Sequence, residues 1–274
     1  MIEINYIFSL FLMIIIILLI VKCKRSKMEG LKYECFVLTL KNSKRIDNFL
    51  YNFNTSVPLN IIYGPDTRTP EKAKVYSKLI DEEKFNLAIK MYEDKNIIRP
   101  NHTYFNLGAV GCFFGHLEVY RRAFEKNIDY AVIFEDNCII TDDNLYLEIN
   151  DTIKDLGNDF EICYFHTWAH IDGGKHERSD YKSLKFLMGA KCYLINVKNM
   201  QKYFKYFLPM DNHVDMKHED LIEKGARVYY KDLRKYMRID RSRGSLIGHS
   251  DHGEKNFISR HNPQATPDDV KWGY

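Results

Sequence analysis

The period of the hydrophobic positions changes repeatedly along the chain and predicts strands alternating with helices. Residues 33–40 form an apolar run rich in aromatic and β-branched side chains, which favours a strand, and an amphipathic stretch follows through Phe53. From 110 to 124, apolar residues recur at helical spacing before the buried strand 130–134 (YAVIF). Further strands are expected at 59–63, 160–165, 188–196 and 227–230, and further helices at 71–92, 144–156 and 197–207. This alternation predicts an α/β fold around a mostly parallel sheet.

No repeat, linker or change of composition divides the chain after its first segment. We therefore expect one globular domain over 28–274, with polar loops at 101–108 and 170–180. Its tail, from about residue 238, is rich in Arg, Gly, Ser and His and is expected to be irregular, with the capacity to close over a site.

The first segment is apolar, and no charged residue occurs between Ile4 and Val21. This length suits one crossing of a bilayer. Glu3 precedes the run and a basic cluster follows it, which is not the pattern of a cleaved signal peptide. We therefore predict an uncleaved signal-anchor and its basic flank over 1–27 and a single-pass membrane protein, with a buried hydrophobic helix as the alternative.

The side of the membrane stays open at this stage. The basic cluster (Lys22, Lys24, Arg25 and Lys27) favours a cytosolic domain by the positive-inside rule. A lumenal domain in the endoplasmic reticulum or Golgi is the alternative, in which the sequons at Asn54, Asn101 and Asn150 would be glycosylated.

Charge and cysteine spacing exclude some classes of function. The formal net charge is +3, and other Lys and Arg residues alternate with Asp and Glu, so we expect no nucleic-acid partner. The six cysteines lack the paired spacing of a zinc or redox motif. Four of them lie in apolar, strand-like runs and are expected as buried thiols, which favours a reducing compartment: Cys35, Cys138, Cys163 and Cys192.

The sharpest candidate for chemistry is Glu135-Asp136-Asn137, directly after the YAVIF strand. Ligands of open α/β sheets bind outside the carboxyl ends of the strands. Carboxylate and amide oxygens there suit Mn²⁺ or Mg²⁺, which neutralises a diphosphate. If the strand continues, Glu135 and Asn137 share one face and Asp136 points to the other. A surface turn after a core strand is the alternative interpretation.

Residues 108–137 (GAVGCFFGHLEVYRRAFEKNIDYAVIFEDN) closely resemble the signature of glycosyltransferase family 25, the lipooligosaccharide biosynthesis and procollagen galactosyltransferase-like family. In that signature a Gly-Cys-x-x-Ser-His helix start leads to a strand ending in Glu-Asp-Asp. Weaker matches occur at 37–49, 63–66 and 188–215, so the resemblance covers roughly 33–235.

The resemblance implies a GT-A-like, Rossmann-type nucleotide-sugar transferase fold and a metal-dependent inverting hexosyltransferase. The donor would be a UDP-sugar, commonly UDP-galactose, with Mn²⁺ or Mg²⁺ as cofactor. The acceptor would be a glycan, glycolipid or protein, as in lipopolysaccharide biosynthesis.

The candidate site residues fall into three groups, and each has a structural alternative. Asp136, Asn137 and His249, with His252 nearby, are the candidate metal ligands, although tail histidines are often only solvated. Candidates for binding the nucleotide sugar are Arg45, Asp66, His116 and Glu135; His116 could equally be a packed core histidine. Candidate general bases are Asp211, Asp215 and Glu219, whose segment could equally be a solvated loop and helix start.

Two departures from the signature motivate a second hypothesis. Gly115 stands where the family has serine, and Asn137 replaces the last aspartate of the triplet, which removes one negative charge. A noncatalytic, glycosyltransferase-like binding or scaffold protein is therefore the alternative function, and a nucleotide-sugar hydrolase is a third.

Overall fold

The computed structural model describes residues 33–97, 99–100, 103–175, 180–240 and 271–272, all within one compact unit, Tyr33–Tyr274. The predicted anchor at 1–27 and the tail histidines His249 and His252 lie outside the described residues. Among the described residues, no helix has both the length and the apolar character needed to cross a membrane.

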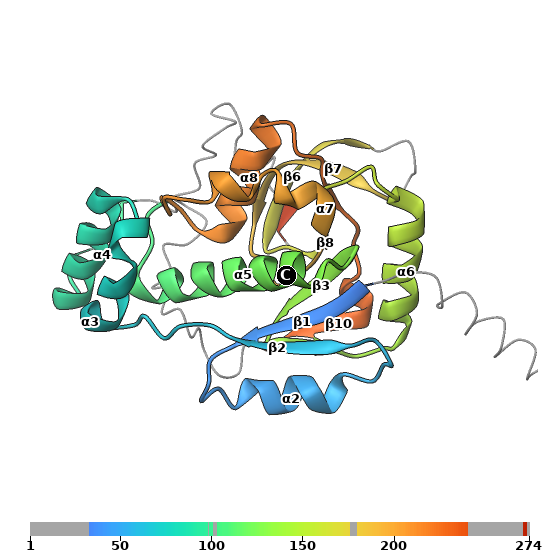
Figure 1. Cartoon of the computed structure of the whole chain (residues 1–274), viewed down its shortest axis with the longest axis horizontal. Helices are drawn as coiled ribbons and strands as arrows, with labels where there is room; N and C mark the ends of the chain where they lie inside the picture. The colour runs from blue at the N-terminus through green and yellow to red at the C-terminus, as the bar shows by residue number, and fades with distance from the viewer. Residues whose placement is uncertain (1–32, 98, 101–102, 176–179, 241–270, 273–274) are drawn as a thin grey trace, which may run out of the picture. The chain divides into compact units, whose positions relative to one another are not determined.

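A nine-stranded sheet forms the centre of the unit, in the order β11-β6-β7-β9-β5-β8-β3-β1-β2 (Figure 1). Its strands are β1 (Tyr33–Thr39), β2 (Leu59–Tyr63), β3 (Tyr130–Glu135), β5 (Ile162–His166), β6 (Ala169–Lys175), β7 (Lys182–Met188), β8 (Cys192–Asn196), β9 (Val228–Tyr230) and β11 (Lys271–Trp272). A second sheet pairs β4 (Cys138–Ile140) with β10 (Met237–Ile239).

Most strands of the large sheet point in one direction, as predicted. β2 and β3 run parallel to β1, and β5 and β9 share this direction because β8 is antiparallel to both β3 and β5. β7 and β11 run in the opposite direction, whereas β6 runs in the same direction as β1. Only the pairs β1–β2, β1–β3 and β5–β9 are parallel neighbours among the described strands, so the sheet is mixed.

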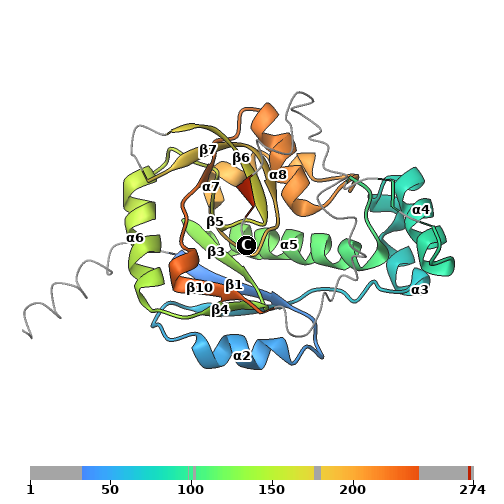
Figure 2. The same cartoon turned by 180° about the vertical axis from the view of Figure 1, so that it is seen from behind.

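Helices cover the sheet on both faces (Figures 1 and 2). The helical segments are α2 (Arg45–Asn52), α3 (Pro70–Ala73), η1 (Lys74–Leu79), α4 (Glu82–Glu93), α5 (Leu107–Lys126), α6 (Asn144–Leu156), α7 (Val197–Gln201), η2 (Phe204–Tyr206), α8 (Val214–Glu223) and η3 (Arg234–Tyr236). α5 contacts β1, β2 and β3, whereas α2 lies on the opposite side of β1 and β2 and contacts β4.

The longest helix, α5, has clear signals at both ends. The Asn106 side chain accepts a hydrogen bond from the Ala109 amide at its start, and Asn127 adopts a left-handed conformation at its end. Its buried face includes Val110, Phe113 and Leu117, which join the main hydrophobic core. The predicted amphipathic helix before the YAVIF strand is therefore confirmed.

Four sequence expectations about elements were wrong. The helix expected at 197–207 ends at Gln201 and is followed by the short helix η2. The single helix at 71–92 is broken at Ile80, which pairs with Met210 instead, and Asp81 then caps α4. The expected loop at 170–180 holds strand β6, because pairing with β7 supplies hydrogen bonds that its polar, glycine-containing sequence does not signal. The expected strand at 188–196 starts only at Cys192, after Gly189 at φ +87°.

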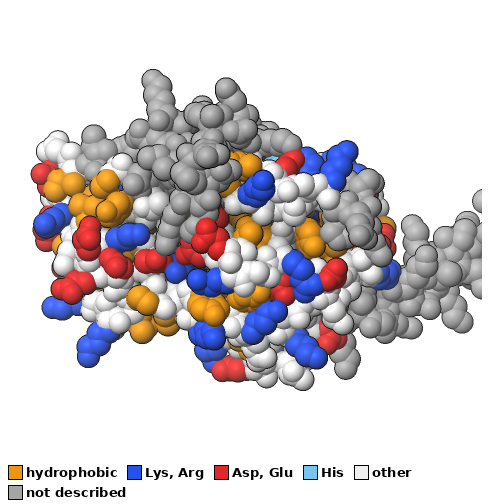
Figure 3. All heavy atoms as spheres, turned by 90° about the horizontal axis from the view of Figure 1, so that it is seen from above, with side chains coloured by type: hydrophobic (Ala, Val, Ile, Leu, Met, Phe, Trp, Pro, Cys, Tyr) orange, Lys and Arg blue, Asp and Glu red, His pale blue; other side chains and the backbone are white. Residues whose placement is uncertain are grey.

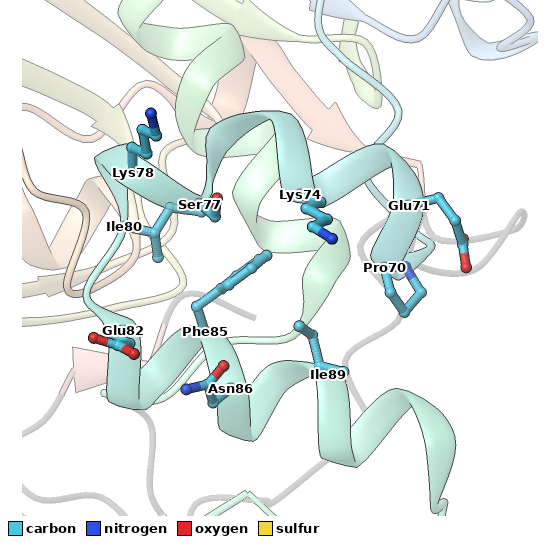
Figure 4. A pocket seen from close by; sticks show the side chains of 10 residues that line it. All are labelled: Pro70, Glu71, Lys74, Ser77, Lys78, Ile80, Glu82, Phe85, Asn86 and Ile89. Carbon is cyan, nitrogen blue, oxygen red and sulfur yellow. The ribbon is translucent and has the colours of Figure 1, made fainter.

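The surface offers two further observations. On the face shown in Figure 3, acidic and basic side chains are interspersed where residues are described. A cavity of about 710 Å³ lies beside α3, η1 and α4, and its lining includes the apolar side chains of Phe85 and Ile89 and the charged side chains of Lys74 and Glu82 (Figure 4). None of the predicted site residues lines this cavity.

Candidate functional site

The carboxyl ends of β1 and β3 lie side by side where the strand order reverses, since β2 continues on the far side of β1. Leu38 of β1 is in register with Glu135 of β3, and the Asp136 amide donates to the Leu38 carbonyl over 3.0 Å. In α/β sheets this switch point is the usual position of a ligand crevice. The predicted acidic triplet is therefore placed at the expected edge of the sheet.

Asp136 connects the loop after β1 to the end of β3. One of its carboxylate oxygens accepts hydrogen bonds from the Thr39 hydroxyl at 2.7 Å and the Ser43 hydroxyl at 2.6 Å. The other lies 3.9 Å from a guanidinium nitrogen of Arg45, the first residue of α2. Burial raises the pKa of Asp136, although the two hydroxyls and Arg45 oppose the effect. The structure thus brings together the predicted residues Arg45 and Asp136.

Glu135 points instead towards α5. Its Oε2 lies 2.5 Å from Lys191 Nζ, and its Oε1 lies 3.8 Å from His116 Nε2. Burial by itself raises the pKa of Glu135, but the Lys191 ammonium and His116 outweigh it and lower this pKa to about 2. The structure therefore brings the predicted pair Glu135 and His116 together, with Lys191 as a third member.

One more side chain, Cys112, belongs to this cluster. Burial, together with the negative charges of Glu135, Asp215 and Asp136, raises the pKa of the Cys112 thiol, and Lys191 opposes this shift. Cys112 and His116 are four residues apart on α5, so both face Glu135. The sulfur of Cys112, a ring nitrogen of His116 and a carboxylate oxygen of Glu135 lie within 4.8 Å of one another.

Asp215, in the first turn of α8, is held by backbone amides. Its Oδ2 accepts from the Gly189 amide at 2.5 Å and its Oδ1 from the Met216 amide at 3.0 Å. A side chain at Gly189 would collide with Trp168, because an added Cβ would lie 2.1 Å from that ring. The glycine thus allows the loop before β8 to approach Asp215.

His116 also begins a buried chain of hydrogen bonds that reaches α8. Its Nδ1 lies 2.7 Å from the Tyr193 hydroxyl, which lies 2.7 Å from the Tyr120 hydroxyl. The Tyr120 hydroxyl is 2.6 Å from His218 Nε2, and His218 Nδ1 contacts the Tyr164 hydroxyl. Burial raises the pKa of each tyrosine and lowers that of His218, so all four groups stay neutral near neutral pH.

These neutral groups can orient their protons in one direction. Glu135 is ionised and favours a proton on the facing Nε2 of His116. Nδ1 of His116 then accepts from Tyr193, Tyr193 from Tyr120, and Tyr120 from His218. Every hydroxyl and ring N–H between His116 Nδ1 and His218 Nε2 then has an acceptor, which buried polar groups require.

Close packing fixes the loop after β2 against α5. A Cβ on Gly111 would lie 2.2 Å from the Pro65 carbonyl oxygen, and one on Gly115 would lie 2.6 Å from Leu38 Cδ1. The Thr67 hydroxyl donates to the Leu107 carbonyl at 2.6 Å. The glycine that departs from the family signature at 115 therefore occupies a position with little room for a side chain.

Four predicted residues stand outside these contacts. Asp66 pairs with Arg68 at 2.7 Å and with Lys72, and the hydrogen bond from Arg68 is the main cause of its lowered pKa. Asp211 pairs with Lys217 at 2.7 Å. Glu219 is buried on α8. Asn137 lies in the turn between β3 and β4, and its side-chain oxygen is buried without a hydrogen-bond partner among the described residues.

Sequence reasoning missed Thr39, Ser43, Lys191, Cys112 and Tyr193. Thr39 lies at the end of a predicted strand and Ser43 follows it, at the edge where ligands bind, which is a usable signal. Cys112 precedes His116 by four residues on a predicted helix, which is also visible in the sequence. Lys191 and Tyr193 reach the cluster only through the pairing of β8 with β3, which the sequence does not specify.

Comparison with known proteins gives one match by sequence and several by structure. The sequence profile described as "Glycosyltransferase family 25 (LPS biosynthesis protein)" matches residues 32–218. Among curated protein sequences no match reaches significance.

The similar structures are distant. One is a mannose-1-phosphate geranyltransferase from Thermus thermophilus, with 11% identity over 81% of each chain and a TM-score of 0.42. Another is "UDP-glucose pyrophosphorylase from acinetobacter baumanii", with 9% identity over 74% of this chain and 87% of that one and a TM-score of 0.40.

Proposed function

Because the chain belongs to glycosyltransferase family 25, we propose that it transfers a hexose, with galactose as our first choice, from a UDP-sugar to a glycan, glycolipid or protein hydroxyl. The observation that carries the proposal is the cluster at the carboxyl ends of β1 and β3, where Asp136 joins Thr39, Ser43 and Arg45. This edge of the sheet is where a nucleotide sugar is expected to bind.

The residues at this edge fit a hard divalent cation. Asn137 offers a buried amide oxygen without a hydrogen-bond partner in the described part of the chain, and Asp136 offers the carboxylate oxygen that faces Arg45. Mn²⁺ or Mg²⁺ bound there would supply charge neutralisation for the leaving diphosphate. Arg45 would add a fixed positive charge, and the hydroxyls of Thr39 and Ser43 would hold the Asp136 carboxylate in place.

We assign the general base to Asp215 among the three carboxylates considered. Inversion requires a base that takes the proton of the acceptor hydroxyl as the diphosphate leaves. Asp215 is half-buried and oriented by two backbone amides. Its negative charge contributes to the raised pKa values of Cys112 and Lys191 in the central cluster. Asp211 is paired with Lys217 by contrast, and Glu219 is 1% exposed.

The test is release of UDP by the full chain from a panel of UDP-hexoses, with and without Mn²⁺ and acceptor. We expect metal-dependent release that falls at least about 100-fold in Asp136→Ala and in Asp215→Asn. Asp151→Asn is the matched control, because this carboxylate lies on α6 with 65% of its side chain exposed.

The outcome separates the competing functions. Absence of release from every donor, in a folded chain that still binds UDP-hexose, would favour the noncatalytic binding protein that Asn137 suggests. Sugar release without any acceptor would favour a hydrolase. The membrane anchor at 1–27 and the cytosolic orientation stay predictions, and they bear on whether the acceptor is lipid-linked.

A further inference from the structure

The side of β3 that faces α5 carries a set of metal-binding atoms separate from Asp136. Cys112 Sγ, a ring nitrogen of His116 and a carboxylate oxygen of Glu135 lie within 4.8 Å of one another. The two α5 residues are one helical turn apart, a spacing that places two ligands on the same face. Glu135 approaches from the end of a different element, β3.

His116 is the strongest indication of a ligand. Its side chain is completely buried, and its Nε2 makes no hydrogen bond to any described residue; the carboxylate oxygen of Glu135 is 3.8 Å away. A buried polar atom without a partner is costly unless something binds it. The other ring nitrogen contacts the Tyr193 hydroxyl at 2.7 Å, the kind of outer contact that orients a metal-binding histidine.

The carboxylate of Glu135 can serve a metal without losing its ion pair. Oε2 lies 2.5 Å from Lys191 Nζ, whereas Oε1 is the oxygen nearest His116. Donors around a tetrahedral Zn²⁺ lie about 3–4 Å apart, given bond lengths of about 2.0–2.3 Å. Only small side-chain rotations are therefore needed to bring the three ligand atoms from their present separations to the distances around a bound ion. Cys112 as a residue is only partly buried.

From these contacts we infer that Cys112, His116 and Glu135 form a binding site for a thiophilic divalent cation of the Zn²⁺ class. Thiolate and imidazole select such ions, whereas Mn²⁺ and Mg²⁺ prefer the all-oxygen environment of Asp136 and Asn137. Binding forms the metal–sulfur bond and releases the thiol proton of Cys112 to solvent. It also uses the lone pair of His116 Nε2, so the imidazole proton moves to Nδ1 and is donated to the Tyr193 hydroxyl, and the hydrogen bonds from His116 to His218 reverse their direction. Three protein ligands leave a fourth position for water or a ligand oxygen.

The inference is independent of glycosyl transfer and is tested by binding. Co²⁺ is added to the full chain as a spectroscopic probe, and Zn²⁺ is then used to displace it. We expect a thiolate-to-cobalt charge-transfer band that saturates at about one ion per chain, the number of sites inferred from this donor set. Zn²⁺ should remove the band, and excess Mn²⁺ should leave it unchanged.

Matched variants assign the band to these ligands. Cys112→Ala should abolish it, and Cys163→Ala, which removes a thiol buried in β5, should preserve it. Glu135→Gln should weaken Zn²⁺ binding at least about 100-fold. Tyr193→Phe, which removes the hydroxyl that contacts both His116 Nδ1 and Tyr120, should weaken it by about 10–100-fold. A band that persists in Cys112→Ala, or one that Mn²⁺ removes, would overturn the inference.

A measurement on the unmodified chain guards against variants that do not fold. Zn²⁺ should slow alkylation of Cys112 by iodoacetamide at least about tenfold, as read by mass spectrometry of the peptide that contains it, because the metal-bound sulfur is no longer a free nucleophile. An alkylation rate at Cys112 that Zn²⁺ does not change would contradict the site directly.

Discussion

Lys191→Met removes the ammonium that compensates the buried Glu135 carboxylate. The exposed fractions of the two side chains are 12% and 14%, so solvent can replace little of the lost interaction. Lys191 and His116 together outweigh the effect of burial and lower the pKa of Glu135 from 4.5 to about 2, with Lys191 the larger contributor. At about 1.4 kcal/mol per pKa unit, this shift corresponds to about 3 kcal/mol, which agrees with the cost of breaking a buried ion pair from one side. We expect the free energy of unfolding to fall by about that amount near neutral pH.

The pH dependence gives a second quantity to check. Because the folded-state pKa of Glu135 is depressed, its contribution to stability is fully present above the unfolded value of about 4.5 and is lost as the pH falls towards 2. In Lys191→Met the ammonium no longer opposes the effect of burial, so the pKa of Glu135 is higher than in the wild-type protein. The variant should therefore be most destabilised near neutral pH, and the difference from wild type should shrink in acid as Glu135 becomes protonated.

The assay is urea denaturation of the full chain at a series of pH values. Lys198→Met is the matched control, because Lys198 is exposed on α7 and should change stability by less than about 0.5 kcal/mol. Glu135→Gln combined with Lys191→Met replaces the ion pair by neutral groups and should recover most of the loss. A cost below about 1 kcal/mol for Lys191→Met, or no recovery in the double variant, would refute the reasoning.

Two further predictions concern packing and buried hydrogen bonds. Gly111→Ala should cost about 1–3 kcal/mol in urea denaturation because its Cβ meets the Pro65 backbone, whereas Gly115→Ala should cost less because the Leu38 side chain can rotate away; equal costs would contradict this distinction. Tyr193→Phe removes a hydroxyl shared by two buried side chains and should cost about 1–3 kcal/mol in the same assay, a prediction that a neutral result would exclude.

The local sequence pattern was sufficient to predict the helices and strands that carry the candidate site. The strand at 59–63 and the helix at 144–156 have the expected bounds, and α5 and β3 differ from expectation only at their ends. The resemblance between 108–137 and family 25 agrees with the profile match over residues 32–218. These regions have strong periodicity or clear caps, so the local signal and the final packing agree.

Pairing between distant strands could not be predicted in the same way. β8 lies between β3 and β5 and is antiparallel to both, which interrupts the parallel order expected from alternating strands and helices. That position brings Lys191 and Tyr193 to Glu135 and His116. A partner this distant in the chain leaves no periodic signal, because its contribution depends on register rather than on composition. The sequence therefore predicted the position of Glu135 at the strand end, but it could not predict which residues Glu135 contacts.

The adjacent carboxylates Glu135 and Asp136 explain why the acidic triplet should not be treated as one ligand set. β3 ends at Glu135, which contacts His116 and Lys191, whereas Asp136 binds the hydroxyls that follow β1. Asn137, which stands in place of the third acidic residue, lies in the turn after β3, and the contacts of Glu135 with His116 and Lys191 do not involve it. Gly115 packs against Leu38, the register partner of Glu135, where a side chain has little room. The two departures from the family signature thus lie at different places, and Asn137 is the one that belongs to the site we propose for a hard cation.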